Sequence, residues 1–308
     1  MSANPTLRLG TRGSELARTQ SGTIAAALER LGLVVELSII KTSGDQNTTA
    51  AFASIGPQGV FVREIEQALV EGRVDLAVHS FKDLPTKSPA ELTIAAVPAR
   101  VDPADLLLVR HDAIAGVAGD WLPLKAGARV GTASARRRVW LTHFRPDLVI
   151  EPLRGNVPTR VRRLEEGHFD AIVLAAAGVE RLQAEQRLGS ALESVVVLRL
   201  DPQRFVPAPA QGALAVQCRA DDSRVLPALT LIDHAPSRAA VTAERDALAR
   251  AEGGCDIAFG AYCHPTDGQH ELTAMHERAG VVHIARIRGT DPATLGAAAW
   301  AELDAAAR

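Results

Sequence analysis

Short apolar segments alternate with amphipathic stretches over the first part of the chain. The segments Leu7–Gly10, Val34–Ile40 and Leu76–Val78 have the length and composition of short, largely buried strands. Between them, Glu15–Leu31 and Val60–Val70 repeat apolar positions with the period of a helix. Strands that alternate with helices in this way predict a mostly parallel sheet within an α/β domain.

The same alternation begins again after the proline-containing segment 98–105. Strands are predicted at Leu106–Val109 and Asp170–Ala175, with helices around them. The proline-rich segment Phe205–Gly212 then leads to Leu214–Gln217, a strand that we expect to rejoin the first sheet. Two chain crossings between two α/β domains predict a hinge.

The pattern changes again from about Ala235 onwards. A helix at Arg238–Ala251 is followed by strands at Glu271–His276 and Val281–Arg288. A last helix is predicted after Asp291, with a proline at its first position. The fold expected is therefore two hinged, doubly wound α/β domains, residues 1–102 with 213–232 and residues 103–212, plus a small C-terminal α+β domain, residues 233–308.

Composition describes an ordinary globular chain of 308 residues, with 47% hydrophobic residues and a net charge of −2. This balance argues against a general nucleic-acid binder. The start Met1–Thr6 has neither a basic nor an apolar segment, so no secretory signal is expected. No apolar run reaches the roughly 20 residues that cross a bilayer. A cytoplasmic protein that binds no membrane is expected.

Polar residues directly follow the third predicted strand, in the sequence DLAVHSFKDLP (Asp75–Pro85). Open α/β sheets place their ligand sites at the carboxyl ends of strands. Lys82 could bind an anionic group there, while Asp83 could accept and donate a proton or stabilise a developing positive charge. An isolated lysine–aspartate pair is most often a solvated strand end, so this signal depends on the rest of the chain.

Arginines supply nearly all the positive charge, since only four of the 34 basic residues are lysines. Nine arginines but only two acidic residues lie between Arg129 and Arg163. Four of the nine are expected on solvated helix faces: Arg138, Arg145, Arg162 and Arg163. The arginines at or next to strand-to-helix turns are Arg136, Arg137, Arg154 and Arg160. A concentrated positive surface predicts a polyanionic ligand, and the few aromatic residues nearby offer no stacking platform for nucleic acid.

Two strand-to-helix turns have related sequences, LGTRGS ending at Ser14 and VGTASA containing Ser134. Each places a serine at the start of a helix, where its side chain can cap the free N–H groups. Free N–H groups and the helix dipole favour anions. The two related half-units are therefore expected to direct two helix N-termini at one ligand.

The three cysteines, Cys218, Cys255 and Cys263, contain no C-x-x-C pair and offer no metal framework. Cys218 and Cys263 fit the usual case of a small buried side chain. Cys255 follows two glycines just past a helix, where a thiol could be exposed. We therefore expect Cys255 to be a nucleophile or an attachment point.

The chain contains six short motifs: TRGS, HSFKDLP, GTASARR, LRGNVPTR, PAQGAL and EGGCD. Their order and spacing resemble those of the porphobilinogen deaminase (hydroxymethylbilane synthase) family. The resemblance extends from about Leu7 to Arg308. The resemblance implies a transferase that joins four porphobilinogen units head to tail. Each step loses ammonia, and hydroxymethylbilane is released on the route to haem. It also implies a monomer and a dipyrromethane cofactor bound through a thioether to Cys255, with no metal.

The resemblance also assigns roles to individual residues. Asp83 would be catalytic, because a carboxylate beside the pyrrole nitrogens stabilises the positive charge left by the loss of ammonia. The residues implied to hold the cofactor, besides Cys255, are Ser80, Lys82, Thr132, Ser134, Arg136, Arg137, Arg154 and Gly155. Those implied to hold the substrate are Arg12, Ser14, Phe61, Arg154, Arg160, Arg181 and Gln211.

Five positions depart from the common family pattern: Gln58, Phe81, Ala133, Ala135 and Asp256. Gln58 removes a positive charge where many members have lysine, and Ala133 removes a hydroxyl group. None of the five replaces the catalytic aspartate or the attachment cysteine, so an active enzyme is expected. The segment Thr42–Gly59 is expected to be a long loop over the site.

The competing interpretation is a non-catalytic protein that binds a small anion on the same two-domain fold. Two hinged α/β domains also describe periplasmic solute-binding proteins and the effector domains of some regulators. The expected lack of a signal peptide argues against the first class, and the lack of a DNA-binding appendage against the second. Neither class would use a third domain that presents Cys255.

Overall fold

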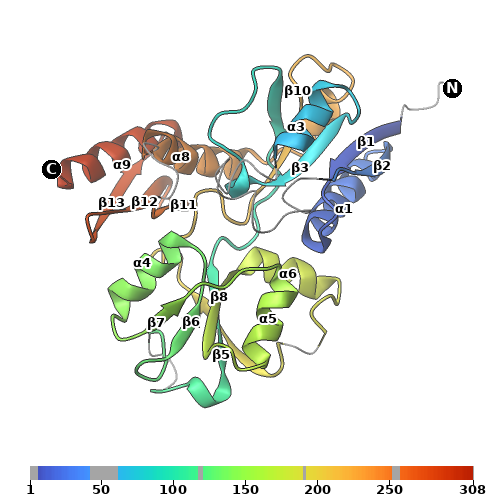
Figure 1. Cartoon of the computed structure of the whole chain (residues 1–308). Coiled ribbons are helices and arrows are strands. Elements are labelled where there is room, and N and C mark those ends of the chain that lie inside the picture. Colours follow the sequence, from blue (N-terminus) through green and yellow to red (C-terminus); the bar gives the residue numbers. More distant parts are fainter. Residues whose placement is uncertain (1–5, 42–61, 117–120, 190–191, 252–256, 308) are drawn as a thin grey trace. The chain divides into compact units, whose positions relative to one another are not determined.

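The computed structural model describes residues 6–41, 62–116, 121–189, 192–251 and 257–307. The chain divides into two compact units (Figure 1). The first unit comprises Met1–Val101 and Gly212–Ala239, and the second comprises Asp102–Gln211 and Ala240–Arg308. The finer division into three domains stays a prediction.

Five strands form the sheet of the first unit: β1 (Thr6–Thr11), β2 (Val34–Ile39), β3 (Leu76–Ser80), β4 (Leu92–Ala96) and β10 (Leu214–Arg219). Their order is β2-β1-β3-β10-β4. The first three are parallel, whereas β10 is antiparallel to both its neighbours. The late strand therefore rejoins the first sheet, as predicted, but inside the sheet and in the opposite direction.

Helix α1 (Glu15–Glu29) begins at the predicted residue because the Ser14 side chain accepts a hydrogen bond from the Ala17 N–H. It ends two residues before the predicted Leu31, and Gly32 follows with a φ of 83°, a conformation that favours glycine. Helix α3 spans Arg63–Val70. The start of the helix predicted from residue 60 lies outside the described residues.

The sheet of the second unit contains β5 (Asp105–Arg110), β6 (Arg129–Gly131), β7 (Val149–Glu151), β8 (Ala171–Ala175) and β9 (Val195–Leu200). The order is β7-β6-β8-β5-β9. Strands β6, β7 and β8 are parallel, and β5 runs antiparallel to β8 and β9. This arrangement repeats that of the first sheet, strand for strand.

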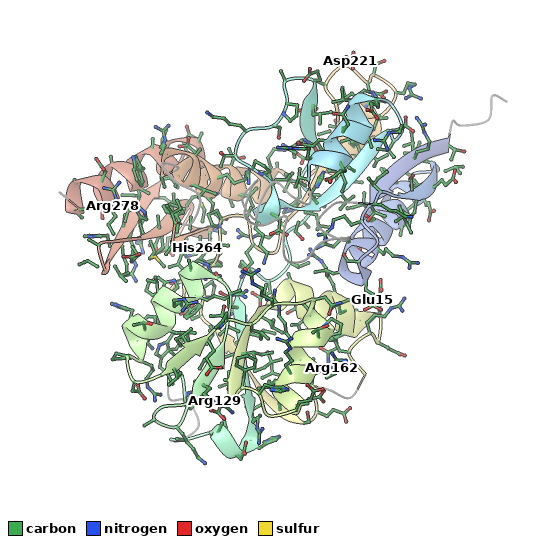
Figure 2. The ribbon with its side chains drawn as sticks, viewed as in Figure 1. Glu15, Arg129, Arg162, Asp221, His264 and Arg278 are labelled. Atoms are coloured by element: carbon green, nitrogen blue, oxygen red, sulfur yellow. The ribbon has the colours of Figure 1, made fainter. Side chains whose placement is uncertain are left out.

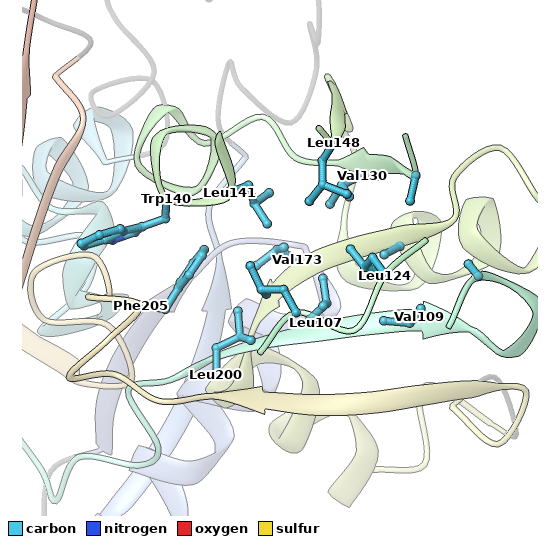
Figure 3. Close-up of a cluster of buried hydrophobic side chains, with 14 of the residues drawn as sticks. Leu107, Val109, Leu124, Val130, Trp140, Leu141, Leu148, Val173, Leu200 and Phe205 are labelled. Carbon is cyan, nitrogen blue, oxygen red and sulfur yellow. The ribbon is translucent and has the colours of Figure 1, made fainter. Parts of the chain in front are cut away.

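Three helices follow the parallel strands of the second sheet: α4 (Ala135–Phe144), α5 (Val157–Glu165) and α6 (Ala176–Ala184). On α4, Trp140 is buried in an apolar cluster with Phe205 and side chains of the sheet (Figure 3). Helices joined to parallel strands and packed on a sheet confirm the predicted α/β class.

The C-terminal part of the second unit contains α8 (Ala235–Ala251, whose first residues belong to the first unit), β11 (Phe259–Thr266), β12 (Gln269–Arg278), β13 (Val281–Gly289) and α9 (Pro292–Ala306). The three strands are antiparallel in chain order. The first of them was not predicted from the sequence, because its glycine and proline weaken the strand pattern. The cap by Asp291 is confirmed, since its carboxylate accepts from the Ala293 N–H.

A buried carboxylate anchors the amino end of β3. Asp75 is 1% exposed and accepts hydrogen bonds from the Arg8 side chain at 3.0 Å and from Arg224 at 3.2 Å. Burial alone would raise the pKa of Asp75, but the hydrogen bonds and charge of Arg8, with help from Arg224, lower it to about 2. The ionised carboxylate therefore stabilises the first unit.

Asp75→Asn is expected to lower the free energy of unfolding at pH 7 by about 2 kcal/mol. The folded-state pKa lies below the unfolded one, so the contribution is complete above about pH 5 and disappears as the pH falls through about 2. In urea denaturation, the difference between wild type and variant should be about half as large at pH 3. Asp112→Asn, at an exposed aspartate paired with Arg110, is the control and should change little. A difference that is independent of pH would contradict this prediction.

Candidate functional site

The predicted ligand-binding residues of the second unit follow three neighbouring strands. Strands β6, β7 and β8 are parallel and adjacent, so their carboxyl ends lie at one edge of the sheet. The residues that follow these ends are Thr132, Ser134, Arg136 and Arg137 after β6, Arg154, Gly155 and Arg160 after β7, and Arg181 on the helix after β8. The topology therefore places all of these residues near the carboxyl ends of the three strands, at one edge of the sheet.

The turn after β6 is fixed by two hydroxyl groups. Ser134 caps α4 by accepting a hydrogen bond from the Arg137 N–H, as the sequence predicted. Thr132 is buried, and its side-chain oxygen accepts from the Ser134 N–H at 3.2 Å. Thr132 and Ser134 thus hold the start of the helix that carries Arg136 and Arg137.

Arg136 and Arg137 are buried, with exposed fractions of 4% and 6%, and share the carboxylate of Asp105, which is fully buried. Arg136 donates to one carboxylate oxygen at 2.8 Å, and Arg137 donates to the other at 2.7 and 3.1 Å. Burial alone would raise the pKa of Asp105, but the two charges lower it to about 2. Asp105 was not among the predicted site residues.

Backbone carbonyl groups complete this cluster. Arg136 donates to the Val206 oxygen at 2.8 Å, and Arg137 to the Val173 oxygen at 2.9 Å. The Gln211 amide donates to Asp105 at 3.0 Å. The predicted contact of Gln211 with substrate stays a prediction, because the structure describes only its bonds within the protein.

In the turn after β7, the Arg160 side chain folds back onto the backbone of the turn. Gly155 has a φ of 113°, and a Cβ atom there would lie 2.9 Å from the Thr159 side chain, so this turn requires glycine. Asn156 caps α5 through the Thr159 N–H, and Arg160 donates to the Gly155 oxygen at 2.7 Å. Arg154 is exposed.

Two arginines at this edge, Arg160 and Arg181, are half-buried. Burial, and then the charge of Arg137, lower the pKa of Arg160 to about 10. Burial also lowers the pKa of Arg181. Arg160 has no carboxylate partner among the residues that the structure describes. A half-buried guanidinium group without a carboxylate partner is a candidate site for an anion.

In the first unit, β3 ends at Ser80 and a short 3-10 turn, Phe81–Asp83, follows. The Ser80 hydroxyl accepts a hydrogen bond from the Gln20 amide at 2.7 Å. Lys82 is half-buried and Asp83 is exposed, so both side chains are accessible to a ligand. Gln20, which sequence analysis did not identify, lies on α1 and orients Ser80.

His79, next to Ser80, has a structural role. It is buried, and its Nε2 lies 3.1 Å from the Gln217 side-chain oxygen. The Gln217 amide in turn donates to Glu66 at 3.0 Å. Burial lowers the pKa of His79 to about 4, so the ring is neutral at pH 7. Arg12 and Ser14, which follow β1 in the same sheet, are both half-buried.

Two of the three cysteines are buried in described parts of the chain, Cys218 on β10 and Cys263 on β11. Burial raises the pKa of Cys218 to about 11. The remaining residues predicted for the site, Cys255 and Phe61, lie outside the described residues, as do Gln58, Asp256 and the predicted loop Thr42–Gly59.

Fold and site together define an α/β protein with cations gathered at the carboxyl ends of the parallel strands of a mixed sheet. The family model for the dipyromethane cofactor binding domain of porphobilinogen deaminase matches residues 7–227. The porphobilinogen deaminase of Syntrophobacter fumaroxidans is 45% identical over 271 residues, which are 87% of this chain and 83% of that protein. The chain therefore belongs to the porphobilinogen deaminase family.

A second relative matches over nearly the whole chain. The porphobilinogen deaminase of a Roseiflexus species is 43% identical over 303 residues, 97% of this chain and 95% of that protein. Among solved structures, the periplasmic VFT2 domain of BvgS from Bordetella pertussis is 16% identical with a TM-score of 0.43, over 75% of this chain and 87% of that domain. Within the described residues, no helix is long and apolar enough to cross a membrane.

The burial of two cysteines predicts their reactivity. In the native protein at pH 8, iodoacetamide should leave Cys218 and Cys263 unmodified, because neither thiol is accessible and the Cys218 thiolate is disfavoured. Peptide mass mapping would locate the label. The same protein in denaturant is the control, in which both cysteines should react. Labelling of Cys218 in the native protein would contradict its burial.

Proposed function

We propose that this chain is a transferase that joins four porphobilinogen units head to tail, loses ammonia at each step and releases hydroxymethylbilane. Membership of the porphobilinogen deaminase family supports this proposal. The observation that carries it is the group of arginines that follow the carboxyl ends of the adjacent parallel strands β6 and β7, namely Arg136, Arg137 and Arg160. Each pyrrole unit carries two carboxylates, which guanidinium groups bind well.

The residues present fit a dipyrromethane cofactor bound through Cys255. Among the described residues, the buried Nε–H of Arg136 has no hydrogen-bond partner, and Arg160 has no carboxylate partner. Both are donors that suit the acetate and propionate groups of the cofactor. Cys218 and Cys263 are buried, which leaves Cys255 for the thioether. When bound, dipyrromethane supplies the pyrrole carbon to which the first substrate unit is joined.

Asp83 is the proposed catalytic residue. Its carboxylate is exposed at the end of β3, beside the half-buried Lys82 and the oriented hydroxyl of Ser80. An exposed carboxylate can approach the pyrrole nitrogens and stabilise positive charge on the ring. Lys82 would hold a carboxylate of the same pyrrole. His79, the residue before Ser80, is buried and neutral at pH 7, so it adds no positive charge there. The monomeric state and cytoplasmic location stay predictions.

Intact-mass measurement tests the attachment and the family chemistry together. Wild-type protein from cells that make porphobilinogen should be heavier than its sequence mass by two linked pyrrole units. Cys255→Ser should lack this increment, because a hydroxyl group cannot form the thioether, and Cys218→Ser is the matched control. If wild-type apo-protein stays unmodified after incubation with porphobilinogen, the anion-binding alternative becomes the better interpretation.

Asp83→Asn is expected to abolish turnover, by about a thousandfold or more, because it removes the charge without changing the volume. The variant should still carry its cofactor and melt at the wild-type temperature, since the side chain is exposed. Release of product from porphobilinogen is the measurement. The control is Asp221→Asn, at an exposed aspartate of the same unit (Figure 2). Near-normal turnover of Asp83→Asn would remove Asp83 from the catalytic role.

A further inference from the structure

The arginine pair at the start of α4 depends on a residue that precedes it by about 30 positions. We infer that Asp105 is a positioning residue that fixes Arg136 and Arg137 in the orientation needed to bind dipyrromethane carboxylates. This inference rests on the proposed function. Asp105 is the first residue of β5, opposite Ala175 at the end of β8, and so lies at the same sheet edge as the predicted ligand-binding residues.

The geometry at Asp105 leaves both arginines little freedom. One carboxylate oxygen accepts from Arg137 Nε and Nη2 and from the Gln211 amide, and the other accepts from Arg136 Nη2. Nη1 of Arg136 donates to the Val206 carbonyl group, and Nη1 of Arg137 donates to that of Val173. Each guanidinium plane is therefore fixed at two or more points, which removes the entropy cost of ordering it when a ligand binds.

The charges explain why one carboxylate is needed and why it does not block the site. Two buried guanidinium groups repel each other, and without a counter-charge one of them would move towards solvent. Asp105 neutralises one of the two charges, so the cluster keeps one net positive charge for an anionic ligand. The buried Nε–H of Arg136 has no partner among the described residues and remains as a donor.

The alternative is that Asp105 only stabilises the fold of the second unit. The two roles differ in what they change. A stabilising residue lowers the melting temperature, and the molecules that remain folded take up cofactor normally. A positioning residue changes the porphobilinogen concentration needed to load folded apo-protein, and it does so only while the arginine that it positions is present.

The experiment uses the full-length apo-protein, incubated with porphobilinogen and followed by intact mass. The variants are Asp105→Asn, Asp105→Glu, Arg137→Gln and the double variant Asp105→Asn with Arg137→Gln. The matched control is Asp102→Asn, three residues away, which removes the charge that pairs with exposed Arg199 but keeps an oxygen to accept the Ala104 N–H. Each variant gives a melting temperature, a maximal loading rate and a half-saturating porphobilinogen concentration.

Asp105→Asn should raise the half-saturating concentration by about tenfold to a hundredfold, the effect of a displacement of about 1 Å. Asp105→Glu keeps the charge and should recover part of this loss. In protein that already carries Arg137→Gln, the Asp105→Asn change should raise the half-saturating concentration by less than about twofold. The effects of two residues that act through each other are not additive. Asp102→Asn should load as the wild type does.

Several outcomes would overturn the inference. Normal loading by folded Asp105→Asn would show that the arginines orient themselves. Equal effects with and without Arg137 would show that Asp105 does not act through that arginine. If neither Asp105 variant folds, the residue belongs to the stability of the second unit. Failure of wild-type apo-protein to gain mass is a different result, because it contradicts the proposed function itself.

Discussion

A guanidinium group that loses its water needs either a counter-charge or a ligand, and this constraint decides how the second unit is built. Exposed arginines such as Arg129 and Arg162 keep much of their water, and their ion pairs lie at the surface (Figure 2). Arg136 and Arg137 are buried, and Asp105 compensates them. Arg160 is half-buried, and no carboxylate in the described part of the chain pairs with it. Among the described residues, this sheet edge thus holds more positive than negative charge.

Local interactions could be predicted from the sequence because both partners lie within a few residues. Ser14, Ser134 and Asp291 each cap a helix through an N–H two or three positions later. Strand ends could be predicted for a similar reason, since buried apolar runs stop where polar residues begin. The α/β class and the positions of Lys82, Asp83 and the turn arginines relative to their strands follow from such local signals.

Partners that come from distant segments could not be predicted. Asp105 and Arg137 are 32 residues apart, Gln20 and Ser80 are 60 apart, and their contact depends on the order of strands in the sheet. Periodicity shows that a segment is a strand but not between which neighbours it lies or in which direction it runs. The antiparallel position of β10 could therefore be established only from the structure. The same holds for the contact between His79 and Gln217.

The two sheets share one topology, and a single position explains why their sites differ. In each sheet, the antiparallel strand begins opposite the last residue of the third parallel strand. In the second unit that position is Asp105, opposite Ala175, whereas in the first unit it is Leu214, opposite Ser80. Leucine cannot supply the counter-charge that Asp105 gives to Arg136 and Arg137, so this position of the first sheet cannot hold a buried cation pair in the same way. The charged groups proposed to act in the first unit, Lys82 and Asp83, are instead half-buried and exposed, which suits the proposed contact with a substrate that enters from water.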